Sequence, residues 1–186
     1  MTPLQRAAVR LAQELERRRT PYMLIGGFAV GLWGHPRTTV DVDATAWVSE
    51  TEIKSFLAAL GRRFRFRSAR PLEAARRAHH VQLETRDGVR IDLSFGRLPF
   101  EREAMARAPS LDIGARKIRV AAVDDLIFYK VVADRPQDHA DVAALVARHR
   151  RRINRRVLDR RVREVAAAAA QPELYQRYLE AWKRRD

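Results

Sequence analysis

The chain has 186 residues, of which 46% are hydrophobic, and it contains no cysteine. This length allows one good core, or a compact catalytic domain with a helical extension. The lack of cysteine excludes a disulfide scaffold and a thiolate metal site. No stretch approaches the roughly 20 apolar residues of a membrane span, and no apolar segment of the signal-peptide kind stands at the N-terminus, so a cytoplasmic protein without membrane contact is expected.

The charge is strongly positive and is concentrated near the C-terminus. The formal net charge is +14, and 33 of the 37 basic residues are arginine. Residues 148–186 contain 13 basic and five acidic residues. This distribution fits a surface that faces RNA or an acidic protein. Solvated helix faces are an equally good explanation, because charge alone does not identify a ligand.

The first predicted elements are a helix, a strand and a short second helix. Apolar residues recur at helical spacing after Thr2 and Pro3, which predicts a helix that runs to about Arg18. The apolar run 22–25 predicts a strand that ends in a glycine turn. A helix-compatible segment then extends to Gly34.

The next predicted strand carries two acids. Over residues 39–47 valines and alanines alternate with polar residues, so Asp41 and Asp43 project from one face. Neighbouring carboxylates repel each other, and a divalent cation is the simplest compensating charge. A solvated strand face is the alternative. Arg37 and Thr38, just before the acids, are expected to contact phosphate oxygens, as are the backbone amides of the glycine turn.

This stretch resembles the nucleotidyltransferase superfamily of DNA polymerase β, particularly its small bacterial members in toxin–antitoxin and abortive-infection systems. Their pattern is a Gly-Gly or Gly-Ser turn, a short helix, and Arg-x-Thr/Ser-x-Asp-x-Asp. Here the pattern consists of Gly26, Gly27, Arg37, Thr39, Asp41 and Asp43. The resemblance implies an α+β fold with a small mixed sheet flanked by helices and a C-terminal helical extension. Many members have serine where Gly27 stands, so one hydroxyl contact to phosphate is missing.

The middle of the chain predicts a helix, a short strand and a hairpin. Ser49 or Thr51 is expected to cap the helix, which Gly61 ends. In the hairpin over 81–95, the apolar faces of the two strands agree only with a three-residue turn in which Gly88 is left-handed. In that register Leu83 faces Ile91 and Gln82 faces Asp92, which points away from the apolar side.

Asp92 is the predicted third carboxylate. Superfamily members carry an acid flanked by aliphatic residues on a later strand beside the Asp-x-Asp strand, and Ile91-Asp92-Leu93 resembles it. An ordinary exposed strand aspartate is the alternative. The resemblance implies that Asp41, Asp43 and Asp92 are catalytic residues that hold two Mg²⁺ ions, with Mn²⁺ as a substitute.

A second block of resemblance lies in the C-terminal part. Members of the superfamily have an Asp-Leu-x-x-x-Lys helix followed by Arg-Pro-x-Asp and a further Asp, and here these residues are Asp125, Leu126, Lys130, Arg135, Pro136, Asp138 and Asp141. Lys130 either contacts the triphosphate or pairs with one of the two later acids and joins two helices. Two more helices are predicted over 153–170 and 172–185. We therefore expect a nucleotidyltransferase core over 1–122 and a helical region over 123–186 packed on it.

The resemblance implies transfer of a nucleoside monophosphate from a nucleoside triphosphate to an acceptor hydroxyl. The acceptor is an RNA 3′ end such as that of tRNA, a protein side chain or a small hydroxylated molecule, in a component of a toxin–antitoxin system. The alternative is a non-catalytic, antitoxin-like module that binds RNA or protein. The five histidines show no metal-ligand spacing, and only His35 is expected near the acids. The sequence does not predict an oligomeric state.

Overall fold

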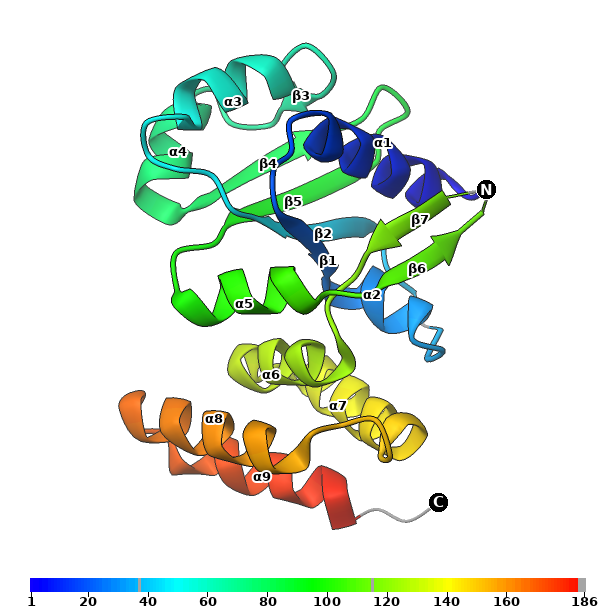
Figure 1. Ribbon diagram of the computed structural model, residues 1–186, viewed down its shortest axis with the longest axis vertical. Coiled ribbons are helices and arrows are strands. Elements are labelled where there is room, and N and C mark those ends of the chain that lie inside the picture. Colours follow the sequence, from blue (N-terminus) through cyan, green and yellow to red (C-terminus); the bar gives the residue numbers. More distant parts are fainter. Residues whose placement is uncertain (37, 115, 184–186) are drawn as a thin grey trace. The chain divides into compact units, whose positions relative to one another are not determined.

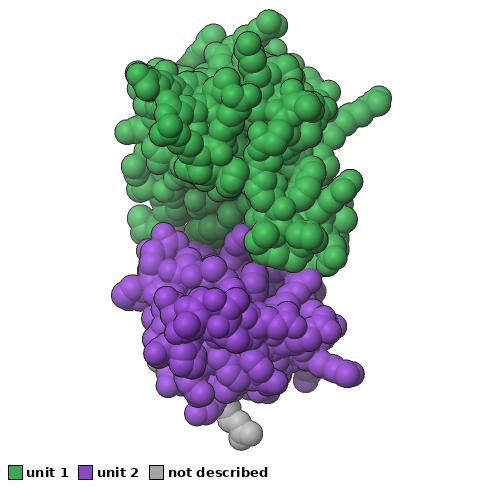
Figure 2. Space-filling view, turned by 90° about the vertical axis from the view of Figure 1, so that its left-hand side faces the viewer, with its two compact units in different colours: residues 1–29, 38–121 green, residues 30–37, 122–186 purple. Residues whose placement is uncertain are grey.

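The computed structural model describes residues 1–36, 38–114 and 116–183 and has a mixed α+β architecture (Figure 1). The predicted fold class is therefore confirmed. The chain divides into two compact units, which Figure 2 shows in different colours. Unit 1 comprises residues 1–29 and 38–121, and unit 2 comprises residues 30–37 and 122–186.

A five-stranded mixed sheet forms the centre of unit 1. Its strands stand in the order β1-β2-β5-β4-β3. Their bounds are β1 (Tyr22–Ile25), β2 (Asp41–Ala46), β3 (Arg65–Phe66), β4 (His80–Glu84) and β5 (Arg90–Phe95). β2 and β5 are parallel, and the other neighbouring pairs are antiparallel. The two strands that carry the predicted acids are thus direct neighbours.

The remaining elements of unit 1 are helices and a small hairpin. They are α1 (Pro3–Arg17), α2 (Gly26–Leu32), which continues into unit 2, α3 (Ile53–Leu60), α4 (Pro71–Ala78), α5 (Pro99–Arg107), β6 (Ser110–Ile113) and β7 (Arg116–Arg119). α1 contacts β2 and β7 (Figure 1). Its start is fixed by a capping box, in which Thr2 Oγ1 accepts from the Gln5 amide at 3.2 Å and Gln5 Oε1 accepts from the Thr2 amide at 2.8 Å.

The two faces of the sheet differ in polarity. Val42 and Ala44 of β2, and Ile91 and Leu93 of β5, are fully buried. The acids alternate with these residues and are only half-buried. Side chains alternate between faces along a strand, and in-register neighbours share a face. One face therefore contributes to the core, and the other presents the carboxylates.

The predicted hairpin is confirmed in its register and its turn. Leu83 pairs with Ile91 and Gln82 with Asp92. The Thr85 amide donates to the Val89 carbonyl at 2.9 Å, which leaves a three-residue turn. Gly88 adopts φ +78°, the left-handed conformation that the register requires.

Two local predictions are wrong. β2 begins at Asp41 rather than Thr39, because its first ladder partner is Arg90, and Val40 is 59% exposed instead of buried. The N-cap of α3 is Glu52, which makes no side-chain capping bond. The Ser49 hydroxyl, one of the two predicted caps, contacts the Glu52 carboxylate instead.

Unit 2 consists mainly of helices, namely α6 (Val123–Ala133), α7 (Pro136–His149), α8 (Arg155–Ala168) and α9 (Pro172–Lys183). α6 contacts α7 and α8, and α9 contacts α7 and α8. Fully buried residues such as Leu126, Leu145 and Tyr178 form its core. Among the described helices, none combines the length and the hydrophobicity needed to cross a bilayer.

A buried ionic network joins α6 to α7. Lys130 Nζ lies 2.7 Å from Asp138 Oδ1 and 2.9 Å from Asp141 Oδ2, and these three side chains are at most 4% exposed. Arg135 Nε lies 2.6 Å from Asp138 Oδ2. Burial by itself would raise the pKa of Asp138, but the hydrogen bonds from Arg135 and Lys130 outweigh it, so the pKa is below its usual value. Two cations balance two carboxylates, which makes the burial tolerable.

Removing the Lys130 ammonium should strongly destabilise the protein. Lys130→Met would remove the ammonium group that contacts both buried carboxylates, Asp138 and Asp141. Breaking a buried ion pair by removing one partner typically costs about 3–5 kcal/mol. We expect a loss of that size in the free energy of unfolding, measured by urea denaturation followed by far-UV circular dichroism.

Lys54→Met is the matched control, because Lys54 is an exposed lysine on α3. It changes the net charge by the same amount and should alter stability by no more than about 0.5 kcal/mol. Equal, small losses in both variants would contradict a structural function for the Lys130 network.

Candidate functional site

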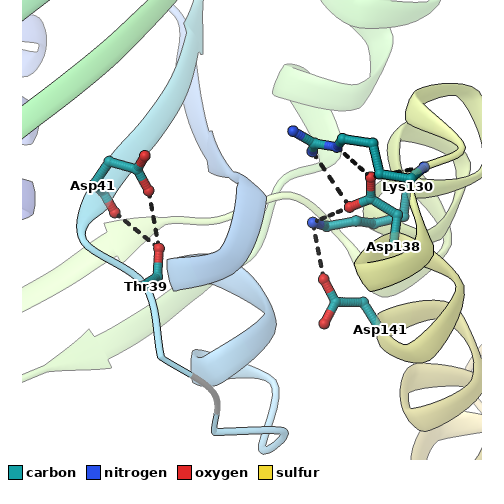
Figure 3. A network of polar contacts seen from close by, with 6 residues as sticks. Thr39, Asp41, Lys130, Asp138 and Asp141 are labelled. Atoms are coloured by element: carbon teal, nitrogen blue, oxygen red, sulfur yellow. Dashed lines mark hydrogen bonds and ion pairs between the residues drawn. The ribbon is translucent and has the colours of Figure 1, made fainter.

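The Asp-x-Asp strand presents its two carboxylates on one face of the unit 1 sheet. Asp41 and Asp43 are two residues apart on β2, and both are half-buried. Just before the strand, Thr39 Oγ1 donates a hydrogen bond of 2.9 Å to Asp41 Oδ1 (Figure 3). The Thr39 hydroxyl therefore fixes the first carboxylate locally.

Asp92 lies beside the pair. In the parallel ladder of β2 and β5, Asp43 is in register with Asp92. Neighbouring strands are about 4.8 Å apart, and in-register side chains share a face. The structure thus brings all three sequence-predicted acids to one face of two adjacent strands, although Asp92 is 49 residues from Asp43 in the sequence.

Asp92 has two polar neighbours on β4, and sequence reasoning overlooked one of them. His80 Nε2 lies 3.4 Å from Asp92 Oδ1. The hydrogen bond from His80 is the main reason that the pKa of Asp92 is below its usual value, and Gln82 adds to it against the opposing effect of burial. The hairpin register could have predicted this contact. Gln82 pairs with Asp92, and His80, two residues before Gln82, lies on the same face of the strand.

The glycine turn lies against the acids. Gly26 follows β1, whose last residue, Ile25, pairs with Asp43. Gly26 has φ +68°, and a Cβ atom at this position would stand 1.8 Å from Asp43 Oδ2 and 2.4 Å from Asp43 Cγ. Glycine is therefore required twice, once for the backbone conformation and once for the space that the carboxylate occupies.

The predicted phosphate contacts are placed as follows. Gly26 and Gly27 form the start of α2, where backbone amides have no intrahelical acceptor. Thr38 is exposed in the segment before β2. Arg37 lies outside the described residues. Lys130 makes the ion pair that the sequence offered as one of two possibilities (Figure 3), and its contact to a triphosphate stays a prediction.

The donor set suits a hard cation in its chemistry. Carboxylate oxygens are the ligands that Mg²⁺ and Mn²⁺ prefer, and three carboxylates share one face here. Within the described residues, however, no group of three or more acidic or histidine side chains is arranged to hold a metal ion. Thr39 Oγ1 contacts Asp41 Oδ1 and His80 Nε2 contacts Asp92 Oδ1, so each of these two contacts uses one oxygen of its carboxylate.

Gly26→Ala should destabilise the protein more than an ordinary left-handed glycine substitution does. The alanine pays roughly 1–2 kcal/mol for the left-handed backbone, and its methyl group also displaces the Asp43 carboxylate. We expect a total loss of about 3 kcal/mol in the free energy of unfolding, measured by urea denaturation.

Gly88→Ala provides the comparison, since Gly88 also has a positive φ but a Cβ there would meet nothing within 4 Å. It should cost only the roughly 1–2 kcal/mol of the left-handed backbone. A Gly26→Ala loss no larger than the Gly88→Ala loss would show that the Asp43 side chain moves aside freely.

The fold is shared with several solved nucleotidyltransferase-like proteins. An antigenic nucleotidyltransferase-like protein from Paracoccidioides brasiliensis has a TM-score of 0.57 at 16% identity, covering 94% of this chain and 91% of that one. The antibiotic-resistance factor ANT(2″)-Ia has a TM-score of 0.58 at 18% identity, with coverages of 91% and 96%. The lincomycin-bound lincosamide antibiotic adenylyltransferase LnuA has a TM-score of 0.55 at 16% identity, with coverages of 78% and 96%.

The family comparison is more specific than the structural one. No curated protein matches the chain. A family model described as "Nucleotidyltransferase of unknown function (DUF6036)" matches residues 4–185. The predicted resemblance to the DNA polymerase β-type superfamily is thereby confirmed. Because the match extends over nearly the whole sequence, the chain belongs to this family of nucleotidyltransferases of unknown function.

Proposed function

We propose that the protein transfers a nucleoside monophosphate from a nucleoside triphosphate to the hydroxyl group of an acceptor. The observation that carries this proposal is the in-register placement of Asp43 and Asp92 on parallel strands, with Asp41 on the same face and Gly26 packed against Asp43. Membership in a nucleotidyltransferase family supports it.

The reaction replaces the phosphoanhydride bond between the α- and β-phosphates with a phosphoester bond to the acceptor. The acceptor oxygen forms a bond to the α-phosphorus, and the bond from the α-phosphorus to its bridging oxygen breaks. Pyrophosphate leaves with the electron pair, and the acceptor proton goes to a carboxylate of the cluster or to water. Most of the rate gain in such a transfer comes from positioning and from compensation of charge.

Asp41, Asp43 and Asp92 are the residues that would hold two divalent cations, Mg²⁺ by preference and Mn²⁺ as a substitute. When bound, such ions neutralise phosphate charge and lower the pKa of an acceptor hydroxyl. The carboxylates themselves exclude unpaired anions from their face, so a triphosphate approaches only with cations. In this arrangement His80 and Gln82 orient Asp92.

The phosphate chain would contact the backbone amides of Gly26 and Gly27. Arg37 and Thr38, and Lys130 as a point charge, are the further side-chain contacts that we propose. Lys130 already neutralises Asp138 and Asp141. If Lys130 also contacts a phosphate, the same ammonium group would bind the phosphate and join α6 to α7.

A small hydroxylated molecule is one acceptor class that we propose, and two structural neighbours support it. LnuA is described as a lincosamide antibiotic adenylyltransferase, and ANT(2″)-Ia as an antibiotic-resistance factor. An RNA 3′ end and a hydroxylated protein side chain remain the other proposed acceptors. The toxin–antitoxin function and the alternative of a non-catalytic binding module both stay predictions from the sequence.

Label transfer tests the proposal directly. The protein is incubated with α-labelled nucleoside triphosphates and Mg²⁺ in the presence of total RNA, lysate protein or a panel of hydroxylated antibiotics. We expect label on one acceptor class, with release of pyrophosphate. Asp43→Asn should lower the transfer rate by at least about 100-fold, because it removes a charge that the transfer requires.

Asp112→Asn is the control for this variant, since Asp112 is an exposed acid on β6 of the same unit. It should leave the rate within about twofold of the wild type. Binding of nucleotide without transfer, unchanged in Asp43→Asn, would favour the non-catalytic module over the enzyme.

Metal removal should abolish transfer reversibly. Treatment with EDTA should reduce the rate to background, and added Mg²⁺ or Mn²⁺ should restore it, because three carboxylates on one face otherwise repel the triphosphate. The measurement is the transfer rate against free metal concentration. Full activity in EDTA would rule out a cation requirement and would leave the acids as contacts to the acceptor alone.

A further inference from the structure

Unit 1 contains a polar cavity whose lining includes none of the three acids. It has a volume of about 620 Å³. Its lining contains six arginines, namely Arg10, Arg17, Arg62, Arg63, Arg86 and Arg116. We call it the arginine pocket. The six residues come from α1, the turn after α3, the β4–β5 turn and β7, so only the folded unit assembles them.

A buried carboxylate organises one side of the arginine pocket. The Glu14 side chain, on α1, is only 5% exposed. It accepts hydrogen bonds from Arg17 and, at 2.9 Å, from Arg18, and its Oε2 lies 3.8 Å from Arg63 Nε. A buried carboxylate is costly unless it is paired. The pairs hold two of the pocket arginines in place, while the Arg17 and Arg63 side chains stay 56% and 61% exposed.

The positive charge of the arginine pocket exceeds what its own acids compensate. Besides Glu14 the lining contains one other acid, Glu16, which accepts a hydrogen bond of 2.7 Å from the Tyr22 hydroxyl. Arg10 pairs with Asp87 at 2.9 Å. Arg62 and Arg86 are exposed, and neither forms an ion pair with an acid in the described part of the chain. With Asp87 counted beside the two lining acids, three positive charges remain in excess around the cavity.

This composition points to a ligand rich in phosphate. Guanidinium groups match phosphate oxygens with paired, charge-assisted hydrogen bonds. The volume lies within the range of about 300–1,000 Å³ that is common for small-molecule sites, but a lining dominated by arginine does not suit an apolar ligand. Several spaced cations suit several spaced anions better than they suit a single one.

We propose that the arginine pocket binds a chain of phosphates, supplied by a nucleic-acid backbone or by a free polyphosphate. The pocket is separate in its residues from Asp41, Asp43 and Asp92. Binding there accordingly does not depend on nucleotidyl transfer, and the Asp43→Asn protein should retain it.

The test compares two triple variants of the full chain. Arg62→Gln, Arg86→Gln and Arg116→Gln together remove pocket charge and leave the partners of Glu14 intact. Arg70→Gln, Arg76→Gln and Arg77→Gln together remove the same charge from residues at and within α4, all exposed and none lining the pocket. Thermal unfolding by circular dichroism checks that both variants are folded. Binding of a short fluorescein-labelled single-stranded RNA is measured by fluorescence anisotropy at several salt concentrations.

We expect the pocket variant to bind the RNA at least about tenfold more weakly. The slope of log K against log salt concentration should also decrease, by the amount that corresponds to about two phosphate contacts. The α4 variant should lose less than about threefold. Displacement of the RNA by tripolyphosphate would identify a free phosphate chain as a sufficient ligand, and displacement by unlabelled RNA alone would identify the nucleic-acid backbone. Equal losses in the two triple variants, or no loss in the pocket variant, would overturn the proposal.

Discussion

The contact between Gly26 and the Asp43 carboxylate is the constraint on which the candidate site depends. A side chain at position 26 would occupy the place of Asp43 Oδ2, and Asp43 is held in register with Asp92 by the parallel ladder. The turn and the three carboxylates are therefore parts of one arrangement. A shift of β2 by one residue along β5 would turn each of its side chains to the opposite face of the sheet. Asp41 and Asp43 would then point into the core and away from Asp92.

The charged residues around Lys130 in unit 2 differ from those of the candidate site because they neutralise one another. Lys130, Arg135, Asp138 and Asp141 form a neutral network whose central members are almost fully buried. Such networks contribute chiefly to a unique packing, because desolvation offsets much of the attraction between the charges. The lowered pKa of Asp138 is consistent with this view, since the carboxylate meets cations and donors that favour its charged form. The motif that resembles the superfamily in this part of the chain thus has a structural basis of its own.

The arginine pocket shows why net charge alone says little about partners. The chain has a formal charge of +14, and the sequence places most of the excess near the C-terminus. The cavity in unit 1 instead collects arginines from four separate segments around one buried glutamate. The placement of the arginines around one cavity matters more than the net charge of the chain. A phosphate chain is attracted mainly by cations within about a Debye length, and it binds most tightly where those cations are already in place.

The sequence by itself determined the hairpin register with Gly88 and the shared face of Asp41 and Asp43, since these depend on local periodicity and turn chemistry. Its resemblance to a known superfamily implied the α+β class and the choice of Asp92 as the third acid. The sequence failed where pairing decides the outcome: β2 starts at Asp41 because Arg90 is its first partner, and His80 reaches Asp92 through a strand pair. Only the tertiary structure set Asp43 in register with Asp92, buried Lys130 between both Asp138 and Asp141, and brought six distant arginines to one cavity. Contacts between residues far apart in sequence depend on the ladder and on packing, which no local pattern records.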